Sequence, residues 1–219
     1  SIIWDLDNGG IKKTLAFESP VVSIALSPDS KKSYVGTANN KIFEVNMENY
    51  EIKNIFEDAN LPAVAMRVSK NNKYLFALRN SLILDIFDIQ NQKKLYSFTF
   101  PLDNMITGFA ENPQTNNFFI LRKDNSITEY DINTGEALIV HALATNSEKN
   151  FLRKMTVSDN GILFYSDIQD NTESIVMKNL ESGQINHATN VRIFSSNIVV
   201  NKDASLLYVS SLNNFITRF

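Results

Sequence analysis

The sequence has no cysteine among its 219 residues, and it has only one tryptophan, five prolines and seven glycines. The absence of cysteine excludes disulfide bonds, thiolate catalysis and cysteine-based zinc sites. The chain also lacks a marked excess of either charge, with 21 basic against 24 acidic residues. A dedicated nucleic-acid domain usually carries a basic excess, because phosphate neutralisation supplies most of its affinity, so the balance disfavours that class.

Long hydrophobic runs are absent as well. Lys, Asp, Glu or Asn interrupts every apolar stretch within about ten positions, whereas a membrane-spanning helix needs roughly 18 to 20 apolar residues. We therefore expect no membrane partner. The apolar fraction of 43% is nevertheless spread along the whole chain and is high enough for a folded domain.

Two further absences favour an intracellular location. The sequence contains no Asn-x-Ser/Thr acceptor of the kind that is glycosylated in secreted proteins. Its first residues, 1–5, lack the basic start and the apolar run of a signal peptide. We expect the protein to act inside the cell.

The most informative feature is an internal repeat of about 43 residues. Residues that close the first predicted strand of successive units are spaced by 42, 42, 47 and 43 positions, at Ser27, Ser69, Glu111, Ser158 and Asn201. A second marker, in the third predicted strand, recurs every 39 to 47 positions, at Trp4, Phe43, Phe87, Tyr130, Met177 and Thr217. Two independent markers thus keep one period.

The strands between these markers are rich in Val, Ile, Phe and Tyr, and the turns contain Asp, Asn and Gly. Four short antiparallel strands that recur every 40 to 45 residues are typical of the blades of a β-propeller. The sequence therefore predicts an all-β protein built of four-stranded antiparallel blades. A β-sandwich with accidental regularity is the alternative, and a period kept over five units disfavours it.

With these motifs the chain resembles the WD-repeat (WD40) β-propellers over all 219 residues. Trp4-Asp5 resembles the Trp-Asp that ends the third strand of a blade, and Ser27-Pro28-Asp29-Ser30 resembles a Ser-Pro-Asp-Gly turn with serine in the glycine position. Phe43-Glu44, Phe87-Asp88 and Tyr130-Asp131 stand where the Trp-Asp pair is expected. The resemblance implies the end of one blade in 1–19, blades at 20–57, 62–100, 104–142 and 151–189, and a partial blade at 195–219.

The chain departs from the family pattern in its polar residues. In the family, a Gly-His pair joins a Ser or Thr, the Trp and a turn Asp in a hydrogen-bonded network. No Gly-His dipeptide is present, and the two histidines, His141 and His187, fall on predicted fourth strands. We therefore expect that network to be missing from most blades.

A narrower similarity covers residues 100–131, which include Phe100-Pro101 and the phrase Met105 to Pro113. This segment resembles a blade of the nucleolar WD-repeat proteins of the cirhin type, which are components of the small-subunit processome. The resemblance implies a nuclear, nucleolar location and a role in ribosome biogenesis and rRNA processing.

Constellations that would carry chemistry are weak. The two histidines belong to different units and no Gly-x-Ser-x-Gly elbow is present, which disfavours a hydrolase triad. Gly9-Gly10 has the wrong spacing for a phosphate loop and fits a hairpin turn. Residues 167–171 lack the glycine and terminal glutamate of a calcium loop. Acidic pairs such as Asp85 with Asp88 and Glu129 with Asp131 are interpreted as blade edges. We expect no catalytic, cofactor or metal site.

What remains is the surface of the loops. The turns between second and third strands would gather on one face of a propeller, and a rigid body that presents such loops is suited to docking partners. The hypothesis is a non-enzymatic scaffold that binds other protein subunits, through the candidate residues Asn39, Asn40, Arg79, Asn80, Lys123, Asp124, Asn125, Asp170, Asn171, Asn213 and Asn214. An enzyme or small-ligand propeller that uses its central channel, and a propeller that contacts RNA, are the alternatives.

The repeat also bears on length. At a period near 43, the chain holds two strands of one blade, four blades and most of another. A closed WD propeller of about seven blades needs roughly 280 to 315 residues. We therefore expect a part of a longer chain, or a propeller completed by other segments.

Overall fold

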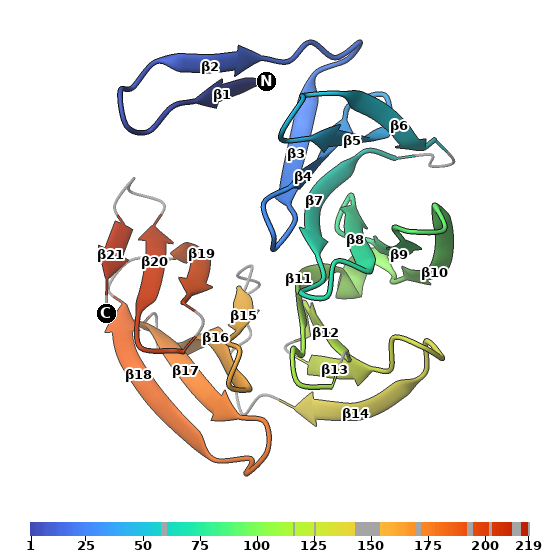
Figure 1. The fold of residues 1–219 in the computed structure, drawn as a ribbon. Coiled ribbons are helices and arrows are strands. Elements are labelled where there is room, and N and C mark those ends of the chain that lie inside the picture. The colour runs from blue at the N-terminus through green and yellow to red at the C-terminus, as the bar shows by residue number, and fades with distance from the viewer. Residues whose placement is uncertain are drawn as a thin grey trace. The chain divides into compact units, whose positions relative to one another are not determined.

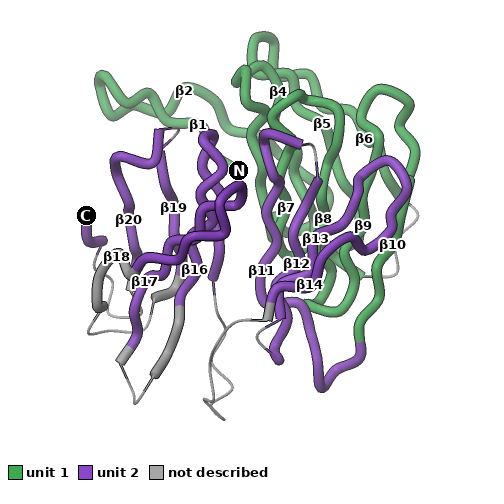
Figure 2. Tube along the Cα trace, turned by 90° about the horizontal axis from the view of Figure 1, so that it is seen from below, with its two compact units in different colours: residues 1–100 green, residues 101–219 purple. Residues whose placement is uncertain are grey.

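The computed structural model shows β-strands as the dominant element (Figure 1). Among the described residues, the helical segment is one short 3₁₀ turn, η1 (Leu102–Asn104). The chain divides into two compact units, Ser1–Phe100 and Pro101–Phe219, which Figure 2 distinguishes by colour. The prediction of an all-β protein is confirmed. The structure describes residues 1–57, 61–115, 117–124, 126–142, 154–169, 172–191, 195–201, 203–211 and 216–218.

The first unit contains a hairpin followed by two four-stranded sheets. The hairpin consists of β1 (Ile2–Trp4) and β2 (Ile11–Thr14). Within the hairpin and within each sheet, each strand pairs antiparallel with the next strand along the chain. The sheets consist of β3 (Val21–Leu26), β4 (Lys32–Thr37), β5 (Ile42–Asn46) and β6 (Ile52–Phe56), and of β7 (Ala63–Val68), β8 (Tyr74–Arg79), β9 (Ile83–Asp88) and β10 (Lys93–Thr99).

The second unit contains two four-stranded sheets and one three-stranded sheet with the same consecutive antiparallel pairing. The first sheet consists of β11 (Ile106–Glu111), β12 (Phe118–Arg122), β13 (Ser126–Tyr130) and β14 (Ala137–Ala142). The second consists of β15 (Met155–Val157), β16 (Ile162–Gln169), β17 (Thr172–Asn179) and β18 (Ile185–Val191). The third consists of β19 (Ser195–Val200), β20 (Leu207–Ser211) and β21 (Ile216–Arg218).

A serine or asparagine, here called the turn residue, follows the first strand of each of these five sheets. Its backbone N–H donates to a carbonyl just before or at the start of the second strand, as in Ser27 to Lys32 at 2.9 Å and Asn112 to Asn117 at 2.7 Å. Glu111 closes β11, as predicted, and the turn residue of this sheet is the next residue, Asn112. The five turn residues are Ser27, Ser69, Asn112, Ser158 and Asn201.

The side chains of these residues also hold the turns. Ser27 Oγ donates to Asp29 Oδ1 at 2.7 Å and accepts from the Lys32 N–H at 2.9 Å, and Ser158 repeats the pattern with Asn160 and Ile162. Three positions after the turn residue the backbone adopts a positive φ, at Ser30, Asn72, Gly161 and Ala204. That conformation is the reason for the glycine in the family turn.

Adjacent sheets within a unit pack face to face through apolar side chains. In the first unit, Ala25 and Tyr34 lie in one buried cluster with Ala63, Leu75 and Phe87. The approach is close at Gly36, where a Cβ atom would lie 2.7 Å from Ser23 Oγ and 3.1 Å from the Ala63 carbonyl oxygen. In the second unit, β11 to β14 pack on β15 to β18, and these pack on β19 to β21, through two further clusters.

The N-terminal hairpin packs on the two central strands of the first sheet, β4 and β5. Ile3 and Leu15 lie against Val35, Phe43 and Val45 in a separate cluster. The turn at Gly9, with φ of 70° and its N–H donating to the Asp5 carbonyl at 2.9 Å, confirms the prediction of a hairpin at the glycine doublet. Within the described part of the chain, no helix has the length and apolar character needed to cross a membrane.

Candidate functional site

The turn between β4 and β5 contains the candidate residues Asn39 and Asn40. Asn39 is exposed and accepts a hydrogen bond from Thr37 Oγ1 at 2.7 Å, and Asn40 has a φ of 71°. The next residue, Lys41, lies between two acidic side chains, with its Nζ 3.4 Å from Glu18 Oε2 and 3.7 Å from Glu57 Oε1. Glu18 and Glu57 belong to the connections before β3 and after β6, so the turn is tied to both connections.

The turn between β8 and β9 contains Asn80, which is exposed with a φ of 47°. Its neighbour Arg79 was expected to face a partner, and this expectation is wrong. The Arg79 residue is only 2% exposed, because its side chain folds into the sheet.

Arg79 is the centre of a buried polar network in the second complete sheet. Its Nε donates to Asp85 Oδ2 at 2.5 Å and its Nη1 donates to the Leu61 carbonyl at 2.5 Å. Asp85 Oδ1 also accepts from Ser97 Oγ at 2.6 Å. The network thus joins three strands and the connection before β7. Asp85 is 2% exposed, which corrects its interpretation as a blade-edge carboxylate.

The turn between β12 and β13 contains the half-buried Lys123 and the exposed Asp124. Asn104 Nδ2 donates to Asp124 Oδ2 at 2.8 Å, and the Asp124 N–H donates to Asn104 Oδ1 at 3.1 Å. Partial burial raises the pKa of Asp124, but hydrogen bonds from Ser126 and Asn104 outweigh burial and hold it below its ordinary value. Again the turn is tied to the connection that precedes its sheet. The candidates Asn125, Asp170, Asn171, Asn213 and Asn214 lie outside the described residues.

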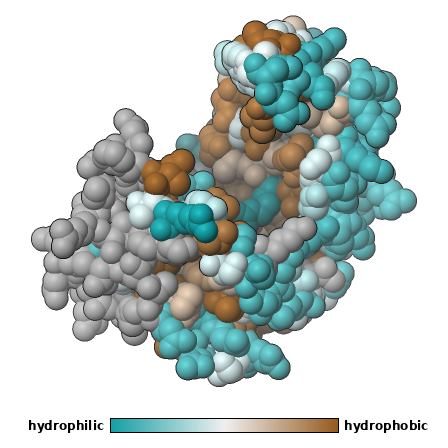
Figure 3. Space-filling view, turned by 60° about the vertical axis from the view of Figure 1, so that its left-hand side comes forward, coloured by the Kyte–Doolittle hydropathy of each residue, from teal (hydrophilic) through white to brown (hydrophobic). Residues whose placement is uncertain are grey.

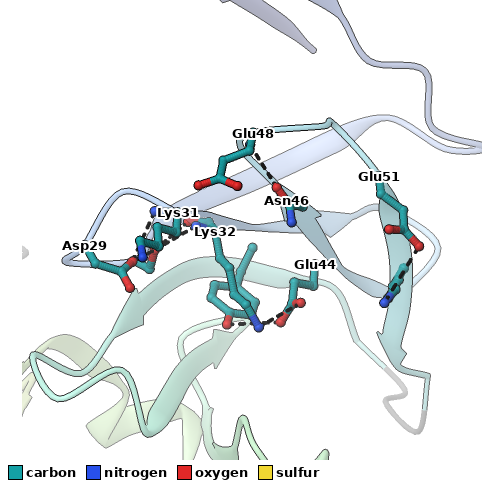
Figure 4. A network of polar contacts seen from close by, with 10 residues as sticks. Asp29, Lys31, Lys32, Glu44, Asn46, Glu48 and Glu51 are labelled. Carbon is teal, nitrogen blue, oxygen red and sulfur yellow. Dashed lines mark hydrogen bonds and ion pairs between the residues drawn. The ribbon is translucent and has the colours of Figure 1, made fainter.

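At the opposite end of the first complete sheet lies a different set of charges (Figure 4). Lys32 Nζ lies 3.0 Å from Glu44 Oε1, and Tyr34 donates its hydroxyl hydrogen to Glu44 Oε2 at 3.3 Å. Burial, and then the Glu44 carboxylate, raise the pKa of Tyr34. Lys32 and Tyr34 on β4 are therefore both paired with Glu44 on β5.

A second polar network joins two sheets of the second unit. Glu129 on β13 accepts from Asn117 Nδ2 at 2.8 Å and lies 3.9 Å from His141 Nε2 on β14. His141 Nδ1 is 3.0 Å from Lys178 Nζ on β17. The contacts with His141, and then with Asn117 and Asn112, hold the pKa of Glu129 below its ordinary value. Glu129 is 8% exposed, which corrects its interpretation as a blade-edge residue.

The sequence analysis did not find the residues of these two buried networks. We expected most blades to lack the family's network of His, Trp and Asp. That expectation attributed the stability of the sheets to packing and strand pairing alone. The sequence does contain a signal for such a network, which is a charged residue within an apolar strand, such as Asp85 within residues 83–88. His141 lies on the fourth strand of its sheet, as predicted, and so does the backbone of His187. In the described residues, no group of three or more His, Asp or Glu side chains is placed to hold a metal ion.

Comparison with known proteins bears on the fold. No family model matches the sequence, and no curated protein matches it. Among solved structures, the chain resembles the β-propeller domain of Cps50 (Swd1) from Myceliophteria thermophila, with a TM-score of 0.75 and 13% sequence identity. The match covers 100% of this chain and 75% of that domain.

The fold is a WD40-like β-propeller. Its sheets are blades, and the chain corresponds to part of a larger propeller. In each described blade that carries a candidate turn, a polar contact ties the turn between the second and third strands to a neighbouring connection. This arrangement holds exposed amide and carboxylate side chains in fixed positions.

Proposed function

We propose that the chain is a non-enzymatic scaffold that binds other protein subunits within a multi-protein assembly. The proposal rests on the polar contacts that hold the candidate turns against the neighbouring connections. Because Lys41 joins Glu18 and Glu57, and Asn104 joins Asp124, the backbone there is held before a partner arrives. A surface that is ordered in advance loses less conformational entropy on binding.

On the first unit the candidate residues are the exposed Asn39 and Asn80 and the half-buried Asn40, and on the second unit they are the exposed Asp124 and the half-buried Lys123. Arg79 is removed from this set because its side chain is buried, and it supports the turn from inside. Amide and carboxylate groups fit a polar protein surface with complementary hydrogen-bonding groups.

The proposed setting of this assembly is the small subunit processome in the nucleolus. The support for this part is the resemblance of residues 100–131 to the cirhin-type proteins. The proposed setting can therefore be tested separately from the scaffold role.

The test is affinity purification of the protein from native cells, with a variant that carries Asn39→Arg and Asn80→Arg. We expect at least a tenfold loss of the co-purified subunits, which corresponds to about 1.4 kcal/mol of binding free energy. Lys31→Glu, an exposed charge reversal at the opposite end of the first blade, is the control and should keep the subunits. Thermal unfolding of each variant checks the fold.

Equal recovery from the Asn39/Asn80 variant and the wild type would contradict the proposed surface. The absence of any stable macromolecular partner of the wild type would contradict the scaffold role. Partners without nucleolar proteins would contradict the proposed setting and leave the scaffold role standing.

A further inference from the structure

The sequence contains two asparagines that are followed directly by glycine, Asn8 before Gly9 and Asn160 before Gly161. In such a pair the backbone nitrogen of the second residue can attack the side-chain amide of the first, because glycine has no side chain that obstructs the approach. Asparagine is for this reason one of the thermolabile residues of proteins. The two pairs lie in different kinds of turn, so their surroundings decide which of them reacts.

Asn8 lies in the turn between β1 and β2, and a turn of the same kind joins the third and fourth strands of each four-stranded blade. In the hairpin the Gly9 N–H donates to the Asp5 carbonyl at 2.9 Å, and the same hydrogen bond recurs from Tyr50 to Asn46 at 2.8 Å. Hydrophilic residues, teal in Figure 3, cover much of the surface in view. The residues in the position of Asn8 in the four blades are all exposed, and they are Asn49, Asn91, Thr134 and Ser182. Exposure of this position is therefore a property of the turn itself.

Asn8 and Gly9 are held by contacts within their own turn. Asn8 Nδ2 donates to Asp5 Oδ2 at 3.0 Å, and Asn8 Oδ1 accepts from the Gly10 N–H at 2.7 Å. Gly9 is exposed, and no atom of the described residues beyond its chain neighbours lies within 4 Å of the position that a Cβ atom would take there. Local opening of an exposed turn costs little free energy, and here it leaves the Gly9 nitrogen accessible to water.

Asn160 and Gly161, in the turn between β15 and β16, are held by two neighbouring blades as well. Asn160 Nδ2 donates to the Asp203 carbonyl of the next blade at 3.2 Å, and Asn160 Oδ1 accepts from Ser158 Oγ at 2.5 Å. Gly161 is buried, and the side-chain amide of Gln114, from the preceding blade, lies where a Cβ atom would be. The Gly161 nitrogen can therefore reach the Asn160 amide only if contacts between blades break.

We propose that Asn8 is a site of spontaneous deamidation in the folded protein, and that the neighbouring blades protect Asn160 from the same reaction. The Gly9 backbone nitrogen gives its proton to the solvent and attacks Asn8 Cγ. The bond between Cγ and Nδ2 then breaks, and the nitrogen takes a proton from the solvent and leaves as ammonia. Water opens the resulting succinimide at either of its carbonyl carbons and gives aspartate or isoaspartate. One water is consumed, one ammonia is released, and no oxidant or reductant takes part.

The reaction changes the turn and the surface of the hairpin. A carboxylate has no hydrogen to donate, so the bond to Asp5 Oδ2 is lost, and a third negative charge appears beside Asp5 and Asp7. Isoaspartate also lengthens the main chain by one methylene before Gly9, which displaces the Gly9 N–H from the Asp5 carbonyl. The site is independent of the proposed scaffold role.

The test is peptide mapping by mass spectrometry after the purified, folded protein has been kept in mildly alkaline buffer. We expect Asn8 to deamidate at least tenfold faster than Asn160, which corresponds to a difference of about 1.4 kcal/mol in activation free energy. In urea the two rates should become similar, because unfolding removes both turns and leaves the same pair of residues.

Two asparagines provide controls within the same molecule. Asn49 and Asn91 occupy the turn position of Asn8, and Asn91 Nδ2 donates to Asp88 Oδ2 at 2.9 Å as Asn8 does to Asp5. They are followed by tyrosine and glutamine, so both should deamidate at least tenfold more slowly than Asn8 in the folded protein and in urea.

The variant Gly9→Gln copies the turn of the second complete blade, where Gln92 adopts a φ of 50° in the position of Gly9. It should slow the reaction at Asn8 at least tenfold and leave the rate at Asn160 unchanged. Thermal unfolding checks that the variant folds. Equal rates at Asn8 and Asn160 in the folded protein, or a reaction of Asn8 in urea alone, would overturn the proposal. An Asn160 that stays slow in urea would show that the blades are not what protects it, and would overturn that part of the proposal.

Discussion

At the scale of single residues, the blades repeat a turn that is held by a side chain. A hydroxyl or amide oxygen of the turn residue takes part in hydrogen bonds with the turn, as in Ser27 with Lys32, Ser69 with Tyr74 and Asn201 with Leu206. Serine and asparagine serve this purpose because both place an acceptor oxygen close to their own backbone. In the third of these sheets Asn112 has this role, because its Oδ1 accepts from the Gln114 N–H at 3.1 Å.

The turn also explains a departure from the family pattern. Ser30 and Ala204 occupy the left-handed position that a glycine takes in the family turn, with φ of 60° in both. A side chain at this φ costs up to about 1 to 2 kcal/mol. The side-chain hydrogen bonds of Ser27 and Asn201 are the interactions that hold these turns in place.

The buried pair of Arg79 and Asp85 gives a prediction on stability. Asp85→Ala would leave the Arg79 guanidinium buried without its carboxylate, so we expect a loss of about 3 to 5 kcal/mol in the free energy of unfolding. The double variant Arg79→Met with Asp85→Leu should recover part of the loss, because it removes both charges. Urea unfolding measures both. A loss below about 1 kcal/mol for Asp85→Ala would show that the pair does not hold the blade.

At the scale of strands and sheets, bulges decide which side chains share a face. The pairing of the first two strands shifts in register between Val21 and Ser23, and equivalent shifts occur at Ala63, Ile106 and Ser195. Each shift lies six residues before the turn residue. In a regular strand, residues three positions apart point to opposite faces. The bulge inserts one extra residue, so Val21 and Ile24 lie on the same face of the sheet, the face that the N-terminal hairpin contacts.

Strict alternation therefore finds the strands but assigns part of each strand to the wrong face. The sequence predicted the strands, their order and the turns, because hydrophobic alternation and turn residues are local signals. The burial of Asp85 and Glu129 was missed because it depends on partners on neighbouring strands, such as Ser97 and His141. The candidate turns were found by their position in the repeat, and Arg79 was misassigned because its side-chain direction is not a local property.

The network around Glu129 predicts a dependence of stability on pH. Because the pKa of Glu129 is lower in the folded chain than its ordinary value, its contribution is fully present above its unfolded pKa of about 4.3. The contribution is lost as the pH falls through the folded pKa. We expect Glu129→Gln to lower the free energy of unfolding at pH 7 and to reduce its decline below about pH 5.

The exposed Glu136, in the turn before β14, provides the control for this measurement. Glu136→Gln should leave the acid decline of the wild type intact. Unfolding by urea at a series of pH values measures both variants. An unchanged pH profile of Glu129→Gln would contradict the role of this carboxylate.

At the scale of the whole molecule, the repeat lets one blade serve as the control for another. Ile24 and Ile198 are the same residue type at equivalent positions, but Ile24 is 53% exposed and Ile198 is 1% exposed. The difference follows from what precedes each sheet. Ile198 packs under Phe164 and Ile175 of a complete blade, whereas β3 follows a hairpin of two strands.

We therefore expect Ile198→Ala to lower the free energy of unfolding by about 2 to 5 kcal/mol, because it leaves a cavity. Ile24→Ala should lower it by less than about 1 kcal/mol, because the removed atoms are half in water. Denaturant unfolding of the two variants side by side measures the difference. Equal losses would mean that Ile24 is packed as closely as Ile198 in the folded protein.

The contact between His141 and Lys178 also determines where a hydrogen atom sits. An ammonium group has hydrogens to donate and no lone pair, so the His141 Nδ1 that it faces at 3.0 Å must carry a lone pair. The neutral ring is then the tautomer with its hydrogen on Nε2, the nitrogen nearest Glu129. The imidazole therefore lies between the Lys178 cation of one blade and the Glu129 carboxylate of another, with Nε2 3.9 Å from Glu129 Oε2, and its nitrogen chemical shifts would report the tautomer directly.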